Sequence, residues 1–188
     1  GTQTTGSIIR PAAYCGVIGY KPTYGDFDKS GILPNSPSLD TLGLIARSID
    51  DIQMMRNILL EEKIKIYESI DLKKFKFAFV RTPYWEEHND ECTKTELEKF
   101  IYELTKLKYN ILEENLDDLI LRSSEIHTNL SGFEFKRSIA ADRINHFEKL
   151  SEILRFGRLT DGNKMSLQTY RKLQGQLEEN RLKIEKRL

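Results

Sequence analysis

Glycine and proline are concentrated in the first 43 residues of this chain, where charged residues are scarce. This segment holds seven of the 11 glycines and four of the five prolines, but only six charged residues. The other 145 residues carry the remaining 52 charges. Glycine is used where the backbone needs positive φ or close approach, and proline fixes turns. We therefore expect a buried, tightly looped segment at the start and a regular, charged chain after it.

Charge and cysteine content argue against several classes of protein. The 29 basic and 29 acidic residues cancel, which disfavours a nucleic-acid or membrane-surface binder. No run approaches the roughly 18 apolar residues of a membrane span, and no secretion signal is visible. Cys15 and Cys92 lie 77 positions apart, which supports neither a disulfide framework nor a zinc cluster. We expect a cytoplasmic protein without a metal, in which Cys15 is buried.

Hydrophobic spacing predicts helices and strands in the rest of the chain. Ser48 resembles the start of a capping box before a helix, and Thr93 with Glu96 resembles a second one. Alternation over 75–80 predicts a strand, and 109–112 is a plausible second strand. From residue 117 onward the pattern predicts helices over 119–131, 133–147 and 166–188. Helix and strand alternate in the middle, which indicates an α/β layering followed by a helical part.

One serine follows a run of small residues at the start of the chain. The sequence opens Gly-Thr-Gln-Thr-Thr-Gly-Ser, and an apolar pair and Arg-Pro follow Ser7. Consecutive small residues let backbone N–H groups converge beside the Ser7 hydroxyl, as an acyl-transfer site requires. Composition alone favours a plainer interpretation, a turn with an incidental serine. A phosphate loop and a Gly-x-Ser-x-Gly nucleophile elbow are disfavoured, because their flanking residues are absent.

The same residues closely resemble the signature of the amidase family, in which Gly-Thr-Gln-Thr-Gly-Gly-Ser-Val-Ile-Arg-Pro-Ala-Ala surrounds the catalytic serine. The likeness continues through residues 15–25 and extends over 38–43, 46–48 and 80–83. It implies a three-layer α/β/α fold around a mixed sheet. The chain opens inside this motif without an initiator Met and ends inside a helical pattern, so we expect the fold to be present only in part.

The expected domain organisation follows from this resemblance. We predict one truncated amidase domain over 1–188. Its parts are a signature and active-site segment at 1–48, an α/β part at 49–112 and a mainly helical part at 113–188.

The resemblance also implies roles for the matched residues. Ser7 corresponds to the nucleophile that forms an acyl-enzyme, and the backbone N–H groups of Thr4, Thr5, Gly6 and Ser7 correspond to the oxyanion hole. Family members activate this serine through a second serine, joined by a cis peptide bond, and a lysine. That lysine must be neutral, and burial lowers its pKa. Both partners lie upstream in the family pattern, so we expect the chain alone to be inactive. No metal or organic cofactor is implied.

Thr5 departs from the family pattern, which usually has glycine there. If the position needs positive φ, a β-branched residue is strained by about 1–3 kcal/mol. We expect an ordinary backbone instead, because the rest of the motif is intact. Arg10 and Asp40 are supporting candidates. Arg10 is expected to hydrogen-bond structurally, with a substrate carboxylate as the alternative partner, and Asp40 to tie a loop near the site.

Other residues suggest further hypotheses. The histidines suggest a Ser-His-Asp arrangement with Ser7, but the charged loop around His88 and the predicted helices around His127 and His146 are typical of solvated or packing roles. Candidates for the wall of an acyl pocket are His127, Phe133, Tyr84 and Trp85.

The predicted function is hydrolysis of a small-molecule carboxylic amide to acid and ammonia or amine. No direct nucleic-acid or membrane partner is expected, and a homo-oligomer stays open. One alternative is the glutaminase component of a tRNA-dependent amidotransferase, whose signature usually has aspartate at the position of Gln3. The other is a catalytically inactive homologue, for which Thr5 is the only support.

Overall fold

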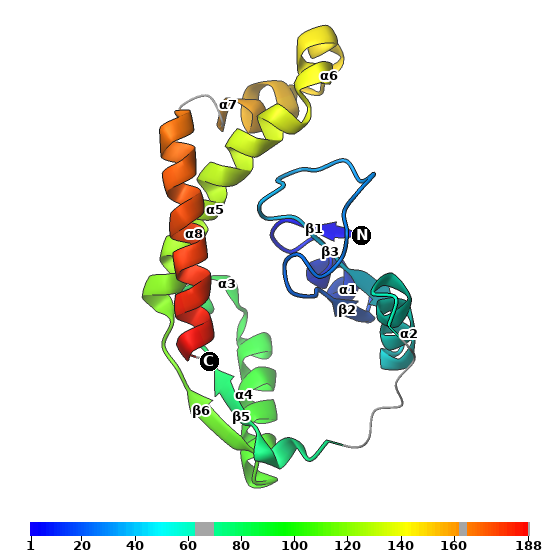
Figure 1. Cartoon of the computed structure of the whole chain (residues 1–188). Coiled ribbons are helices and arrows are strands. Elements are labelled where there is room, and N and C mark those ends of the chain that lie inside the picture. The colour runs from blue at the N-terminus through cyan, green and yellow to red at the C-terminus, as the bar shows by residue number, and fades with distance from the viewer. Residues whose placement is uncertain (63–69, 162–164, 188) are drawn as a thin grey trace. The chain divides into compact units, whose positions relative to one another are not determined.

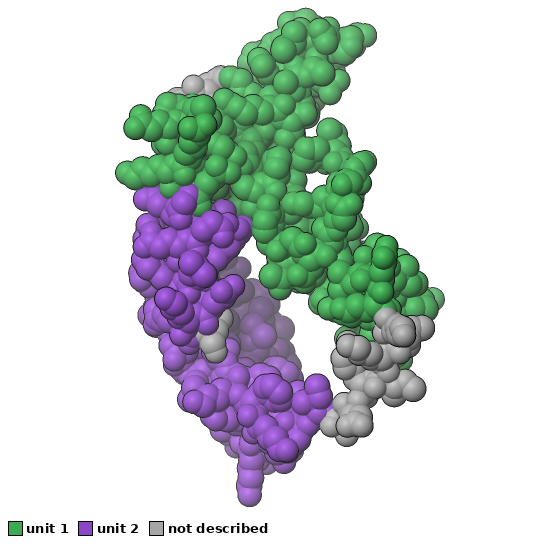
Figure 2. All heavy atoms as spheres, in the orientation of Figure 1, with its two compact units in different colours: residues 1–65, 127–174 green, residues 66–126, 175–188 purple. Residues whose placement is uncertain are grey.

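The computed structural model describes residues 1–62, 70–161 and 165–187, which form two compact units. Unit 1 comprises Gly1–Lys65 and His127–Gln174, and unit 2 comprises Ile66–Ile126 and Gly175–Leu188 (Figure 2). Helices and strands occur together along the chain (Figure 1), so the predicted α/β class is confirmed. The single domain over 1–188 stays a prediction.

Two short antiparallel strand pairs frame the first segment of unit 1. Strand β1 (Thr2–Gln3) pairs with β3 (Thr41–Leu42), and β2 (Ile18–Tyr20) pairs with β4 (Leu44–Ala46). Helix α1 (Ile9–Tyr14) connects β1 to β2. The 41–46 segment therefore holds both ends of the motif that contains Ser7.

Gly43 lets this arrangement close, because it lies between β3 and β4 against the turn that follows Ser7. A Cβ at Gly43 would lie 2.5 Å from the Tyr20 carbonyl oxygen and would overlap the Ile8 side chain. Ile8 itself is fully buried. Close backbone approach, rather than positive φ, explains this glycine.

A parallel pair in unit 2 confirms both predicted strands. Strands β5 (Lys76–Phe79) and β6 (Asn110–Glu113) pair in parallel and are connected by helices α3 (Trp85–His88) and α4 (Glu91–Lys106). Parallel neighbours need such a crossover connection. In the described part of the chain the strands form three two-stranded sheets, which are the part of the implied mixed-sheet fold that these residues supply.

The helix caps agree with the sequence in one case and not in the other. Helix α2 (Ile49–Leu59) begins as predicted, with Ser48 Oγ accepting the Asp51 N–H at 3.1 Å. The cap predicted at Thr93 is wrong: Asp90 caps α4 by accepting the Thr93 N–H at 2.7 Å. A carboxylate three residues earlier is a strong N-terminal acceptor.

The second half is helical, with one boundary that the sequence did not predict. Helix α5 (Asp117–Ser138) runs through the break expected at residue 132, and α6 (Ala140–Asn145) follows. Helix α8 (Leu167–Arg187) matches the predicted last helix, while Leu188 lies outside the described residues. The remaining short helical elements are η1 (Leu72–Lys74), η2 (Phe147–Lys149), the π-helical η3 (Ile153–Arg158) and α7 (Leu159–Asp161).

The first segment is looped as predicted but is less buried than predicted. Its interior contacts come from a few residues, among them Ile8, Ala12 and Phe27. In contrast, Tyr14 is 87% exposed and Leu33 is 73% exposed. Scarcity of charge therefore does not mean burial within this chain. Among the described helices, none combines the length and apolarity that a membrane crossing requires.

Candidate active site

Ser7 lies in the turn between β1 and α1, and its side chain is exposed. The next residue, Ile8, is fully buried against Gly43. Burying one side chain of a tight turn fixes the turn, so the neighbouring Ser7 hydroxyl is held at the surface. Among the described residues, none forms a hydrogen bond with Ser7 Oγ.

Gln3 holds the signature loop, here defined as residues 3–9, from the inside. Its side chain is buried. Its Oε1 accepts the N–H groups of Ile8 at 2.9 Å and Ile9 at 3.1 Å, and its Nε2 donates to the Thr5 carbonyl at 2.9 Å. One amide group therefore bonds both sides of the loop across Ser7, as a buried polar group must to offset its desolvation.

Three consecutive peptide groups in this loop have their carbonyls bonded. The Thr4 carbonyl lies 3.3 Å from His127 Nε2, the Thr5 carbonyl accepts from Gln3, and the Gly6 carbonyl accepts the Arg10 N–H at 2.9 Å. No peptide bond among the described residues is cis, and in a trans peptide C=O and N–H point in opposite directions.

The other ends of the same peptides carry free donors. These are the N–H groups of Thr5, Gly6 and Ser7, which form no hydrogen bond with any residue that the structure describes. The loop can therefore offer three backbone donors beside an exposed hydroxyl.

Thr5 has an ordinary backbone, as expected. Positive φ among described non-glycine residues is confined to Glu61 and Lys108. The strain considered for a β-branched residue at this position is therefore absent. Thr5 Oγ1 lies 3.0 Å from Nε2 of His127.

Asp40 ties the signature loop to the loop over 34–40. Its buried carboxylate accepts the Thr4 hydroxyl at 2.5 Å and the N–H groups of Asn35 at 2.7 Å and Ser36 at 2.8 Å. The Thr4 hydroxyl in turn accepts from Asn35 Nδ2 at 2.8 Å. Because hydrogen bonds to a carboxylate are the stronger kind, this cluster fixes Thr4 firmly.

A second buried carboxylate, Glu134 of α5, holds the same 34–40 loop. It accepts the Ser36 hydroxyl at 2.5 Å, the Ser38 N–H at 3.1 Å and the Tyr170 hydroxyl at 2.7 Å. Burial, and then the hydrogen bond to Glu134, raise the pKa of Tyr170 from its ordinary value of 10.0 to about 12. The Tyr170 ring stacks on Phe133 with ring centroids 4.5 Å apart, so Phe133 belongs to this packed cluster.

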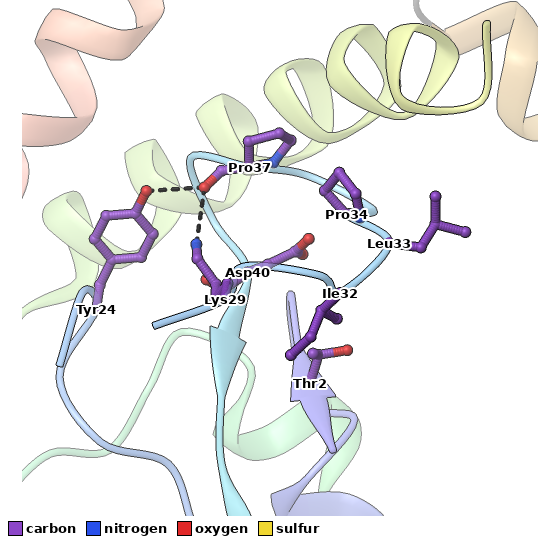
Figure 3. Close-up of a pocket in the computed structure, with 8 residues that line it drawn as sticks. All are labelled: Thr2, Tyr24, Lys29, Ile32, Leu33, Pro34, Pro37 and Asp40. Carbon is purple, nitrogen blue, oxygen red and sulfur yellow. Dashed lines mark hydrogen bonds between the residues drawn. The ribbon is translucent and has the colours of Figure 1, made fainter. Parts of the chain in front are cut away.

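A pocket of about 370 Å³ opens beside Asp40. Figure 3 shows Tyr24 and Lys29 both directed at the Pro37 carbonyl, which accepts from them at 2.8 and 3.1 Å. Apolar side chains make up most of the rest of the wall. The full lining is Thr2, Tyr24, Lys29, Ile32, Leu33, Pro34, Pro37 and Asp40.

Arg10 and Cys15 lie away from this network. The Arg10 side chain is exposed, and no described residue accepts a hydrogen bond from its guanidinium. Cys15 is exposed at the end of α1, so its predicted burial is wrong. The short helix α1 buries Ala12 and leaves its last turn at the surface.

The other histidines and aromatic candidates have separate surroundings. In unit 2, His88 stacks on Tyr84 with ring centroids 5.6 Å apart, and Trp85 packs edge-on against Phe79 at 5.8 Å. His146 ends helix α6. Among the described residues, no group of three or more His, Cys, Asp or Glu side chains is arranged to hold a metal ion.

The sequence profile of the amidase family matches residues 1–183. The chain belongs to the amidase family. Curated relatives include the indoleacetamide hydrolase of Allorhizobium ampelinum, 29% identical over 141 residues, which are 75% of this chain and 30% of that protein. A glutamyl-tRNA(Gln) amidotransferase subunit of Campylobacter fetus is 27% identical over 196 residues, 94% of this chain and 39% of that one.

Solved amidase structures share the fold. A crystallised amidase superimposes with a TM-score of 0.82 and 28% identity, over 98% of this chain and 41% of its own. The predicted family and its fold are thereby confirmed. The chain spans 30% to 41% of the length of these relatives.

Two functional positions were not predicted from the sequence. The pattern indicates Gln3 only as a signature residue, although its position inside a run of small residues was a signal for a loop-holding side chain. Glu134 carried no signal, because one acidic residue in a charged helix does not stand out. Their partners come from Thr5, Ile8 and Ile9 in one case and from a segment about 100 positions earlier, Ser36–Ser38, in the other.

Proposed function

We propose that this chain supplies the nucleophile and the oxyanion-binding loop of an enzyme that hydrolyses a carboxylic amide to the acid and ammonia or an amine. One observation carries the proposal: an exposed Ser7 hydroxyl adjoins three N–H groups that have no partner among the described residues. Membership of the amidase family supports the same chemistry.

The proposed reaction has two halves. Ser7 Oγ bonds to the amide carbon and its proton passes to a general base, while the N–H groups of Thr4, Thr5, Gly6 and Ser7 are the candidate donors to the carbonyl oxygen as it becomes negative. The C–N bond then breaks, and the amine leaves with a proton. Water cleaves the resulting ester, which restores Ser7. Each donor of this kind lowers the barrier by roughly 3–4 kcal/mol.

The general base is proposed to be the lysine and second serine that the amidase pattern places before the nucleophile. Within the described residues, Lys21 does not take this role, because its Nζ donates to the Pro22 carbonyl at 2.6 Å. On this proposal the 188 residues by themselves release no ammonia. In the full-length protein, Arg10 and Asp40 support the loop without taking part in the bond changes.

The substrate is proposed to be a small-molecule amide. Similarity to glutamyl-tRNA(Gln) amidotransferase subunits supports the alternative of a glutaminase that works with a tRNA-amidating partner. Gln3 stands where that signature usually has aspartate, and this favours a stand-alone amidase. The inactive homologue loses its main support, because Thr5 has an ordinary backbone.

The test is turnover by the full-length protein with Ser7 replaced. Ammonia release is measured from a panel of amides that includes indole-3-acetamide and glutamine, with and without an amidotransferase partner. We expect Ser7→Ala to abolish turnover and labelling by a fluorophosphonate probe, and the exposed control Ser30→Ala to leave both unchanged. Turnover that persists in Ser7→Ala removes the assignment. Glutamine turnover that depends on the partner identifies the alternative.

A further inference from the structure

His127 of α5 contacts the signature loop where the sequence departs from the family pattern. Its Nε2 lies 3.0 Å from Thr5 Oγ1 and 3.3 Å from the Thr4 carbonyl oxygen. Both contacts lie within unit 1. No other histidine of the described chain contacts this loop.

The two contacts together determine which form of the ring fits. A carbonyl oxygen only accepts hydrogen bonds, so the Thr4 contact is favourable only when Nε2 carries the proton. That N–H then reaches both the Thr4 carbonyl and the Thr5 hydroxyl. A protonated Nε2 has no lone pair to accept the proton of Thr5. The geometry therefore disfavours a Thr5–His127 nucleophile–base pair, although the distance alone would allow one.

The Thr4 carbonyl and the Thr5 N–H belong to the same planar peptide group. Holding the carbonyl at His127 fixes the plane and directs the Thr5 N–H away from the ring. A hydrogen bond at the carbonyl also polarises the peptide and strengthens its N–H as a donor. The neighbouring Thr5–Gly6 peptide is held in the same way by Gln3, whose Nε2 donates to the Thr5 carbonyl at 2.9 Å.

We propose that His127 is a positioning residue that orients the Thr4–Thr5 peptide so that the Thr5 N–H faces the oxyanion, with the Thr5 hydroxyl as its second anchor. This inference rests on the proposed acyl-transfer function. It also gives a reason for threonine at a position where the family usually has glycine: the hydroxyl supplies an anchor that glycine lacks.

The experiment compares two amide replacements of His127 in the full-length protein. The side-chain amide of His127→Gln reaches the place of Nε2, whereas that of His127→Asn reaches only the place of Nδ1. We expect His127→Gln to keep kcat within about threefold of the wild type. We expect His127→Asn to lower kcat by about tenfold with KM unchanged, less than the roughly 10²–10³ for deleting a donor outright.

A double-mutant cycle with Thr5→Val tests the pairing. If the two side chains act together, Thr5→Val lowers kcat in the wild type and has little further effect in His127→Asn. The tautomer is checked in ¹⁵N-histidine spectra, where the signal lost in His127→Gln is expected to show a protonated Nε2. A protonated Nδ1 with a bare Nε2 overturns the inference.

The outcomes separate this inference from the proposed function. Ser7-dependent turnover with an unaffected His127→Asn, or with both replacements equally impaired, overturns the positioning role and leaves the function in place. Turnover that survives Ser7→Ala overturns both. If Thr5→Val rather than Ser7→Ala abolishes probe labelling, Thr5 is the nucleophile and the positioning role is wrong.

Discussion

At the residue scale, a few side chains with two or more hydrogen bonds decide the shape of the candidate site. Gln3 bonds three backbone groups of the signature loop, and Asp40 bonds two N–H groups and the Thr4 hydroxyl. Ser7 contributes no such bond among the described residues. The reactive hydroxyl is thus held by its neighbours, which leaves it available to a substrate.

Replacing Gln3 by Glu tests this arrangement. The change keeps the acceptor for Ile8 and Ile9 but puts a carboxylate oxygen where an N–H donated to Thr5. We expect the free energy of unfolding to fall by about 1–3 kcal/mol, because a buried carbonyl loses its donor, and kcat to fall with it. Urea denaturation and steady-state kinetics measure the two effects. The exposed Gln168→Glu on α8 is the control, and equal stability of the two variants would contradict the prediction.

At the element scale, short helices and strands depend on their ends. Helices α2 and α4 each begin with a side-chain oxygen that accepts an N–H three residues on, from Ser48 and Asp90 respectively. The hydrogen bond from Thr93 lowers the pKa of Asp90, so this cap is retained as pH falls toward the ordinary range of an aspartate and weakens below it.

The cap of α2 gives a measurable stability effect. Ser48→Ala removes the acceptor for the Asp51 N–H, and we expect a loss of about 1 kcal/mol in the free energy of unfolding. Ser48→Asp keeps an acceptor there and should restore most of the loss. Thermal or urea denaturation of the full-length protein compares the three. A Ser48→Asp variant as unstable as Ser48→Ala would show that the hydroxyl acts otherwise.

At the scale of the whole molecule, unit 1 is assembled from segments that are far apart in the sequence. Glu134 of α5 accepts hydrogen bonds from the 34–40 loop and from Tyr170 of α8. The same loop bonds Thr4 through Asp40. Burying two carboxylates is favourable only with donors arranged around them, so these residues specify how the segments meet.

Tyr170→Phe tests this assembly through its pH dependence. Below pH 10 we expect the variant to be less stable by roughly 1–3 kcal/mol, because Glu134 loses a donor. The folded pKa of about 12 exceeds the ordinary 10.0, so the unfolded chain ionises first as pH rises. The wild type therefore loses this contribution between pH 10 and about 12, and the variant does not.

The measurement is the urea midpoint of the full-length protein at a series of pH values. The exposed Tyr102→Phe on α4 serves as the matched control and should follow the wild type. A difference between Tyr170→Phe and the wild type that stays constant up to about pH 12 would contradict the raised pKa.

The sequence by itself determined the features that local chemistry decides. Alternation predicted β5 and β6, the Ser48 spacing predicted α2, and the motif around Ser7 indicated the family. Tertiary structure decided the rest. The cap of α4 and the unbroken α5 differ from the local pattern, because an earlier carboxylate and helix packing outweighed weak local preferences.

The partners in the candidate site were also decided by tertiary structure. His127 reaches Thr5 across 122 positions, and Ser36 reaches Glu134 across 98. No periodicity or spacing encodes such pairs. They form because desolvated polar groups must find partners wherever the fold brings them together.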